Sequence, residues 1–311
     1  MEDGRLNSSD TSAIMLDILG HQLHLAQDPN SKHLGTTVWD ASMVFVKYLE
    51  KNCRKGRFSI SKLKGKRVIE LGAGCGLAGI GMALLGCDVI STDQVEVLPL
   101  LMRNIERNTS RILQSDSDMT SFGSINAAEL DWGNQDHIKA VDPPFDFIIG
   151  TDVVYSEHLL DPLLQTIFAL AGPRTTILLG YEIRSTMVHD QMIDMWKSNF
   201  NLKSIPRSKM DVKYQHPSIQ LFAMDLKSRL RSEKSGNLNN CEGNSCSSEE
   251  SVSDMKDDKN GIDEDSEHTG IKECDDDLKV TLAIKNGKLD GWESRRHGSF
   301  AARLLKDVKI T

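Results

Sequence analysis

The sequence feature that most constrains the fold is a glycine-rich turn in residues 68–77, which read VIELGAGCGL. An apolar run of strand type ends at Leu71, and Gly72, Gly74 and Gly76 lead into a stretch of helix type. Glycine at alternate positions lets the backbone turn sharply and lets a ligand lie against main-chain N–H groups at the start of a helix. One or two glycines would suffice for a turn without a ligand, so the turn predicts a nucleotide-like ligand.

Apolar runs of strand type alternate with helical patterns across residues 1–227, as in a parallel sheet covered on both faces. The expected strands are residues 67–72, 88–93, 125–130, 145–152, 175–182, 202–206 and 218–225. The expected helices are residues 40–51, 77–85, 95–108, 159–171 and 186–198. Only residues 207–217 separate the last two strands, so these strands should form an antiparallel hairpin. We therefore predict an α/β fold with a Rossmann-like seven-stranded sheet, parallel except for one antiparallel edge strand, and helices on both faces.

Two glycine patterns compete for the identity of the nucleotide. Residues 74–79 match the G-x-G-x-x-G of dinucleotide-binding proteins, and Asp93 follows at about the spacing of 20 residues that this pattern has. In that pattern the first glycine directly follows the strand, whereas the triplet counted from Gly72 breaks at Leu77. Residues 70–76 (ELGAGCG) instead resemble motif I of class I S-adenosylmethionine-dependent methyltransferases. In that class an acidic residue at the end of the second strand, the place of Asp93, binds both ribose hydroxyls.

Three further motifs surround the glycine turn. GTTVWD at 35–40 precedes the first expected helix, LDWG at 130–133 closes the third strand and GTDVVY at 150–155 closes the fourth. In this order the motifs resemble the family-16 seven-strand methyltransferases, which mostly methylate lysine on proteins, and the resemblance covers residues 12–226. Within the family, residues 38–50, 181–184 and 200–206 most resemble the enzymes that methylate valosin-containing AAA ATPases. The resemblance implies the methyltransferase version of the predicted sheet.

The resemblance also implies S-adenosylmethionine as the cofactor. It assigns these residues to cofactor binding: Trp39, Glu70, Gly72, Ala73, Gly74, Asp93, Gln94, Trp132 and Thr151. The chemistry agrees, because an indole can cover the adenine ring or attract a sulfonium by about 0.5–2 kcal/mol. A carboxylate can accept hydrogen bonds from both ribose hydroxyls. For either tryptophan a place in the core remains an alternative, and for Asp93 a solvated strand end.

Asp152 and Tyr155 are the candidate catalytic residues. A free lysine with a pKa of about 10.4 is neutral only about once in a thousand molecules near pH 7.4, a cost of about 4 kcal/mol unless burial lowers the pKa. Asp152 follows the fourth expected strand, where a carboxylate can orient the incoming ammonium, and Tyr155 can wall an apolar channel. A helix N-cap remains an alternative for Asp152, and a core position for Tyr155. No dedicated general base is identifiable, and none is needed if the proton leaves through water.

The charge of the chain is unevenly distributed. The net charge is −8, but residues 228–277 carry 15 acidic and 6 basic side chains, and residues 278–311 carry 8 basic and 3 acidic ones. Residues 1–227 are therefore only mildly acidic. Such a charge argues against a general affinity for nucleic-acid phosphates.

Composition divides the chain into three parts. We expect a methyltransferase domain at 1–227, an acidic disordered linker at 228–277, and a C-terminal segment at 278–311 that either docks on the domain or stays disordered. The six cysteines form no C-x-x-C pair and no histidine cluster has zinc spacing, so no metal is expected. No membrane span or signal peptide is visible. We therefore expect a monomer in the cytoplasm, with the nucleus left open as a second compartment.

Three hypotheses for the function follow. The leading one is a protein-lysine N-methyltransferase whose substrate is a protein, such as an AAA ATPase of the valosin-containing type or a chaperone. The second is a methyltransferase for a small molecule or RNA. The third is a non-catalytic cofactor-binding module, or a nicotinamide oxidoreductase on the weaker glycine match.

Overall fold

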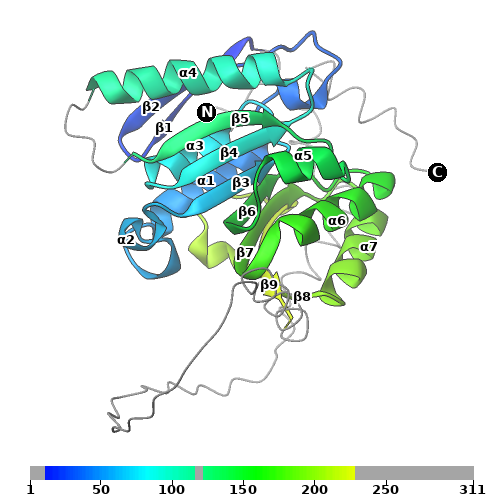
Figure 1. Ribbon diagram of the computed structural model, residues 1–311. Coiled ribbons are helices and arrows are strands. Elements are labelled where there is room, and N and C mark those ends of the chain that lie inside the picture. Colours follow the sequence, from blue (N-terminus) through cyan, green and yellow to red (C-terminus); the bar gives the residue numbers. More distant parts are fainter. Residues whose placement is uncertain (1–10, 116–121, 228–311) are drawn as a thin grey trace, which may run out of the picture.

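The centre of the structure is a sheet of seven strands (Figure 1), seen in a computed structural model that describes residues 11–115 and 122–227. In spatial order the strands are β5 (Ser124–Glu129), β4 (Asp88–Asp93), β3 (Arg67–Leu71), β6 (Phe145–Thr151), β7 (Ala171–Glu182), β9 (Ile219–Leu226) and β8 (Phe200–Ser204). Each of the seven apolar runs expected from the sequence overlaps one of these strands. The predicted α/β fold is therefore confirmed.

Strand direction follows the prediction with one correction. The pairs among β5, β4, β3, β6 and β7 are all parallel, and β8 and β9 form the expected antiparallel hairpin. The antiparallel strand, however, is not at the edge, because β9 lies between β7 and β8 and pairs antiparallel with both. The more apolar strand takes the interior place: β9 buries five of its eight residues, whereas only one of the five residues of β8 is buried.

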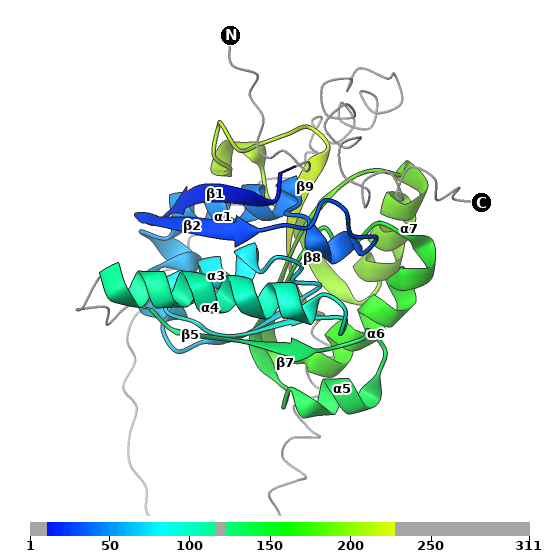
Figure 2. The same cartoon turned by 90° about the horizontal axis from the view of Figure 1, so that it is seen from above.

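Helices cover both faces of the sheet, as Figure 2 shows from above. One face carries α1 (Asp40–Asn52), α3 (Leu77–Leu84) and α4 (Leu98–Ser115), and the other carries α5 (Gln135–Ala140), α6 (Leu160–Leu170) and α7 (Thr186–Lys197). Val68 and Ile69 of β3 belong to separate apolar clusters on the two faces, because successive strand residues point in opposite directions. All five expected helices are present, while α5 and the short α2 (Ile60–Leu63) were not expected.

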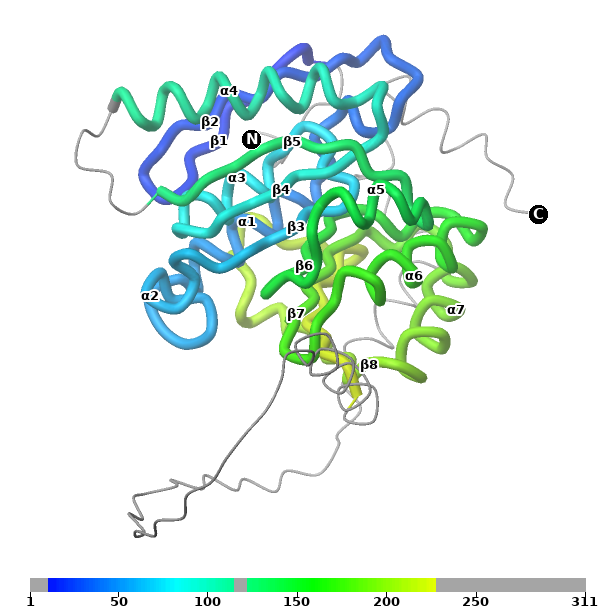
Figure 3. Tube along the Cα trace, viewed as in Figure 1, coloured from blue at the N-terminus to red at the C-terminus, as the bar shows by residue number. Residues whose placement is uncertain are grey.

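A hairpin that the sequence did not reveal precedes the sheet. Strands β1 (Ala13–Ile18) and β2 (His21–Ala26) pair antiparallel through a two-residue turn, in which Leu19 and Gly20 have φ of 52° and 85°. The Cα trace in Figure 3 shows this hairpin running beside α4. Its residues alternate over too short a stretch to stand out as strands from the sequence alone.

Two buried asparagines on α4 attach the hairpin to the domain. The side chain of Asn108 accepts a hydrogen bond from the His24 N–H at 2.8 Å and donates to the His24 carbonyl at 3.1 Å. Asn104 makes the same pair of bonds to the backbone of Ala26, at 2.8 and 3.0 Å. The two amides lie one helical turn apart, so together they replace a missing neighbouring strand for β2.

The expected domain boundaries reach beyond the described residues. The linker at 228–277 and the C-terminal segment at 278–311 lie outside the described part, as do residues 1–10 and 116–121. Within the described ranges, no helix combines the length and the apolar composition that a membrane crossing requires.

Asn108→Ala should lower the free energy of unfolding by about 2–3 kcal/mol, because the backbone groups of His24 lose their partners in a partly buried place. Urea unfolding of the two proteins measures this difference. Asn201→Ala is the control, since among the described residues the exposed Asn201 side chain on β8 bonds only to Asp225, and its loss should cost less than about 0.5 kcal/mol. Equal losses for the two variants would show that the Asn108 amide does not hold the hairpin.

Candidate active site

A pocket of about 800 Å³ opens at the carboxyl ends of the parallel strands. The carboxyl end of β3 lies between the carboxyl ends of β4 and β6. The chain order therefore reverses at β3, and open α/β sheets bind ligands in the crevice at such a point. Every site residue predicted from the sequence lines this pocket, with the exception of Glu70.

The glycine turn forms the floor of the pocket. Gly72 and Gly74 have φ of 61° and 55°, which side-chain-bearing residues rarely adopt. A Cβ added to Gly72 would lie 2.9 Å from Val153, and one added to Gly74 would lie 3.0 Å from the carbonyl oxygen of Gly35. The loop that contains Gly35 therefore packs directly on the turn, and a ligand in the pocket meets bare backbone there.

Asp93, the last residue of the neighbouring strand β4, lies beside the glycine turn. Its Oδ2 accepts the Gly74 N–H at 2.7 Å and its Oδ1 accepts the Gln94 N–H at 2.8 Å. Burial raises the pKa of the Asp93 carboxyl, the two backbone donors oppose that rise, and the nearby Asp131 adds to it. A carboxylate offers about four lone-pair positions, so the two backbone bonds leave acceptor capacity for a ligand with paired hydroxyls.

Glu70 requires a correction. Strand alternation turns its side chain away from the pocket and under α3, where the hydroxyl of Ser91 donates to Oε2 at 2.5 Å and the backbone of Gly79 also bonds to the carboxyl. Burial is the main cause that raises the pKa of Glu70 to about 8. Glu70 therefore supports the start of α3 and does not touch the pocket.

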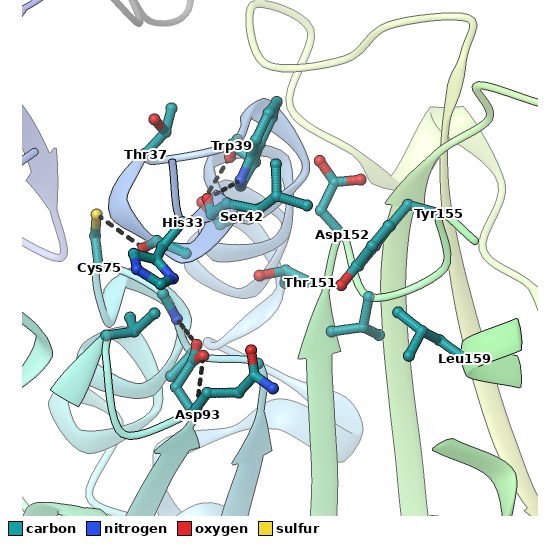
Figure 4. Close-up of a pocket in the computed structure, with 18 of the residues that line it drawn as sticks. His33, Thr37, Trp39, Ser42, Cys75, Asp93, Thr151, Asp152, Tyr155 and Leu159 are labelled. Carbon is teal, nitrogen blue, oxygen red and sulfur yellow. Dashed lines mark hydrogen bonds between the residues drawn. The ribbon is translucent and has the colours of Figure 1, made fainter. Parts of the chain in front are cut away.

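The second part of the pocket centres on Asp152. Figure 4 shows Asp152 between Trp39 on one side and Tyr155 on the other. Both terminal nitrogens of Arg184 donate to the Asp152 carboxylate, Nη1 to Oδ1 at 2.6 Å and Nη2 to Oδ2 at 2.5 Å. The Asp152 side chain is only 2% exposed, so this is a buried bidentate ion pair. The expected carboxylate is present, but it is already paired within the protein.

The same arginine joins this carboxylate to the aromatic wall. The Arg184 guanidinium carbon lies 5.1 Å from the centre of the Trp39 ring, within the range of a cation–π contact. The Trp39 indole N–H donates to the carbonyl of Leu34 at 3.0 Å, which fixes the ring in its plane. Asp152 itself has φ of 63° and donates its own N–H to Gly180. No helix begins at Asp152, so the alternative of a helix N-cap is wrong.

Tyr155 lies half-buried in the opposite wall. Burial raises the pKa of Tyr155 to about 12, the charges of Asp93 and Asp152 add to that rise, and Arg184 opposes it. Tyr155 therefore keeps its proton near neutral pH, and it can donate or accept a hydrogen bond without acting as a base.

The parts of the pocket that sequence reasoning missed include Arg184, Asp131, the loop from Lys32 to Leu34 and the segment after Tyr155 with His158. Asp131 stood inside a recognised motif, and its Oδ1 accepts from the Gln94 side chain at 3.1 Å. Its position next to Trp132 was the available signal. Arg184 had no such signal, because its partner lies 32 residues earlier in the chain.

Possible metal-binding atoms of Glu129, Asp131 and His137 lie within 4.8 Å of one another at the rim of this region. The backbone N–H of Asp131 donates to His137 Nδ1 at 3.2 Å, which occupies that ring nitrogen. The group is partly exposed, and acidic groups of this kind are common on protein surfaces without a metal. It gives no reason to change the expectation that the protein uses no metal.

Comparison with known proteins identifies the family. Residues 19–198 match the family model described as lysine methyltransferase. The chain is 36% identical to protein N-lysine methyltransferase METTL21A of Danio rerio, over 56% of this chain and 72% of that protein. It is 29% identical to METTL21A of Xenopus tropicalis, over 70% of this chain and 90% of that protein. It is 33% identical to EEF1A lysine methyltransferase 3 of Mus musculus, over 53% and 64%.

Among solved structures, the T. thermophilus 16S rRNA N2 G1207 methyltransferase RsmC, in complex with AdoMet and guanosine, aligns with a TM-score of 0.47 and 16% identity. The alignment covers 69% of this chain and 50% of that one. The family match spans more than half of the chain and includes the glycine turn, Asp93, Asp152 and Arg184. The chain therefore belongs to the lysine methyltransferase family, whose members transfer methyl groups from S-adenosylmethionine to protein lysine side chains.

Proposed function

We propose that the pocket at the carboxyl ends of β3, β4 and β6 is the active site for methylation of a lysine on a protein substrate. The observation that carries this proposal is the continuity of the pocket. One end has bare backbone and the Asp93 carboxylate, and the other end has Asp152 between two aromatic walls. A volume of about 800 Å³ falls in the range of about 300–1,000 Å³ that ligand sites occupy.

The residues at the first end fit S-adenosylmethionine. The two unused acceptor positions of Asp93 suit the two ribose hydroxyls. Gly72 and Gly74 have no side chain and Ala73 has only a methyl group, so the turn allows close approach of the ligand. Trp132, Gln94 and Thr151 complete this end of the pocket. When bound, the cofactor supplies a methyl group on a sulfonium, which is already activated for displacement.

The residues at the second end suit a lysine side chain. Oδ1 of Asp152 accepts from both the Glu182 N–H and Arg184, whereas within the described part of the chain Oδ2 accepts from Arg184 alone. Oδ2 therefore has the remaining acceptor position for an amine. Trp39 and Tyr155 would flank the methylene chain of the substrate.

The charge of Arg184 matters for the protonation of that amine. An unpaired buried carboxylate would stabilise the lysine ammonium, which cannot attack a methyl group. Because Arg184 already offsets the charge of Asp152, the carboxylate can hold the amine with less preference for its charged form. Water would take the proton of the amine, and the bound cofactor would supply the methyl group, so the role of Asp152 and Arg184 would be to hold and orient the uncharged amine.

The motif resemblance indicates the class of protein substrate. We favour an AAA ATPase of the valosin-containing type, on the motif resemblance, with a chaperone as another candidate. We also favour a monomeric enzyme in the cytoplasm, with the nucleus left open as a second compartment. The name of the mouse relative gives EEF1A as the substrate of that protein, so EEF1A belongs in the same test panel.

Incubation of a cell lysate with the protein and tritiated S-adenosylmethionine should label a proteinaceous product. Protease treatment should remove the label and ribonuclease should leave it, and mass spectrometry should find the methyl groups on lysine. The Asp93→Ala variant is the control for background labelling. Label that ribonuclease removes, or that passes a small-molecule filter, would contradict the proposal.

Asp93→Ala should weaken S-adenosylmethionine binding by about 1.5–3 kcal/mol, because hydrogen bonds to a charged acceptor are lost and the Gly74 N–H loses its partner. Isothermal titration measures the dissociation constant. Asp88→Ala, at the exposed opposite end of the same strand, is the matched control and should leave the constant unchanged. A parent-like constant for Asp93→Ala would remove Asp93 from the cofactor site.

Asp152→Asn and Arg184→Met should each destabilise the fold by about 3 kcal/mol. The first leaves Arg184 with the longer contact to Glu182, at 3.5 Å, and the second leaves the buried Asp152 carboxylate without its cation. The double variant should lose at least about 1 kcal/mol less than the sum of the two, as measured by urea unfolding. Turnover on a protein substrate should fall about 100-fold for Asp152→Asn and remain low in the double variant.

The asparagine variant is a mild change for the backbone, because asparagine tolerates the left-handed conformation of residue 152. Additive losses of stability would mean that the ion pair contributes nothing. Near-parent turnover in the double variant would mean that Asp152 does not hold the amine.

A further inference from the structure

The part of the chain between α1 and β3 is strongly basic. Residues 51–67 contain eight lysine or arginine side chains and no acidic one. Five of these are exposed and have no ion-pair partner among the described residues, and we call them the basic patch: Arg54, Lys55, Arg57, Lys62 and Lys64. The methyl-transfer reaction does not use this patch, because it precedes the amino end of β3 and the pocket lies at the carboxyl ends of the strands.

Apolar anchors hold the basic patch in place. Phe58 is buried and meets Tyr48 of α1 edge to face, with ring centres 5.6 Å apart. Leu63 of α2 is fully buried. Because these two side chains point inward, the charged residues beside them point into solvent. Figure 1 shows α2 and the loop before it standing out from the side of the domain.

The remaining basic residues of this stretch already have partners. Lys51 donates to the Met210 carbonyl at 2.6 Å, Lys66 pairs with Asp146 at 2.9 Å, and Arg67 lies 3.6 Å from the Asp142 carboxylate. Across 11–115 and 122–227, no acidic side chain forms an ion pair with a member of the basic patch. Five like charges without a counter-charge form a site that attracts an anionic partner.

A matching acidic segment belongs to the same chain. Residues 249–277 carry 13 acidic and 3 basic side chains. The last described strand, β9, runs antiparallel to β7 and therefore ends at the amino ends of the parallel strands. The basic patch lies on this same side of the sheet.

The register of the sheet gives the distance. Ile69 on β3 lies beside Ile148, Ile148 beside Ile177, and Ile177 beside Met224 on β9. Three strand spacings of about 4.8 Å place Met224 about 14 Å from Ile69. The residues between Lys227 and residue 249 can span up to about 75 Å when extended, so covalent geometry lets the acidic segment reach the patch.

We propose that the acidic segment, residues 249–277, binds the basic patch of its own chain. Tethering favours this occupant over a free one, because a linked segment is present at an effective concentration of order millimolar. The net charge of −8 disfavours nucleic acid as the occupant. The contact lies away from the pocket and would cover the patch against other anionic macromolecules.

Zero-length carbodiimide crosslinking of the full-length protein, followed by mass spectrometry, tests the contact. Carboxylates of residues 249–277 should link to Lys55, Lys62 and Lys64, and these links should fall at least about fivefold between 20 mM and 500 mM salt, since salt screens the attraction. Lys197 and Lys203 are the controls: both are exposed and lie near the end of β9, outside the patch. They should link less often than the patch lysines.

A double variant separates the effect of charge on the crosslinks from the effect of proximity. Arg54→Gln with Arg57→Gln leaves every lysine in place, and both side chains are exposed, so folding should be unaffected. Links to the three patch lysines should fall at least about threefold. Unchanged links in this variant, or links mainly to Lys197 and Lys203, would overturn the proposal.

Two other patterns would also overturn it. Links mainly to lysines of residues 278–311 would show that the basic end of the chain takes the acidic segment. Links between isotopically labelled and unlabelled copies would show that a second molecule occupies the patch.

A binding assay tests whether the acidic segment covers the patch. A fluorescent single-stranded RNA should bind at least about fivefold more tightly once the acidic residues of 249–277 are changed to their amides. Equal binding would contradict a covered patch.

Discussion

The hydrogen bond from the backbone N–H of Gly74 to Oδ2 of Asp93, 2.7 Å long, ties the glycine turn to the end of the neighbouring strand. The bond joins the ends of two parallel strands that lie side by side, and Gly74 adopts the left-handed backbone conformation that favours glycine. The loop around Gly35 then packs on the turn, and Glu70 supports α3 from below. The end of the pocket that we propose for the cofactor is therefore held in place by contacts within the protein, which would reduce the ordering cost of binding.

The other end of the pocket depends on a second fixed interaction, the buried pair of Asp152 and Arg184. A carboxylate in a lysine channel faces two demands, because it must hold the amine and yet must not favour the ammonium. A bidentate arginine meets both demands by fixing the orientation of the carboxylate and offsetting its charge. The same guanidinium lies against Trp39, so the aromatic wall and the carboxylate form one unit.

The sequence predicted the sheet, its helices and most of the pocket, because these follow from local signals. Period-two apolar runs, glycines at alternate positions and residues directly after strands can be recognised one at a time. The position of β9 inside the sheet, the role of Asn108 and the pairing of Arg184 depend on residues far apart in the chain. Glu70 was misplaced because membership in a motif does not state which face of a strand a side chain occupies. The hairpin at residues 13–26 was missed since its strands are short and mixed in polarity.

A crystal structure with S-adenosylhomocysteine bound would test the central claim most directly, namely that one continuous pocket serves both cofactor and lysine. We predict that both ribose hydroxyls lie within hydrogen-bonding distance of the Asp93 carboxylate, and that the sulfur faces the space between Asp152 and Tyr155. A ribose that makes no contact with Asp93, or a sulfur directed away from Asp152, would contradict the account.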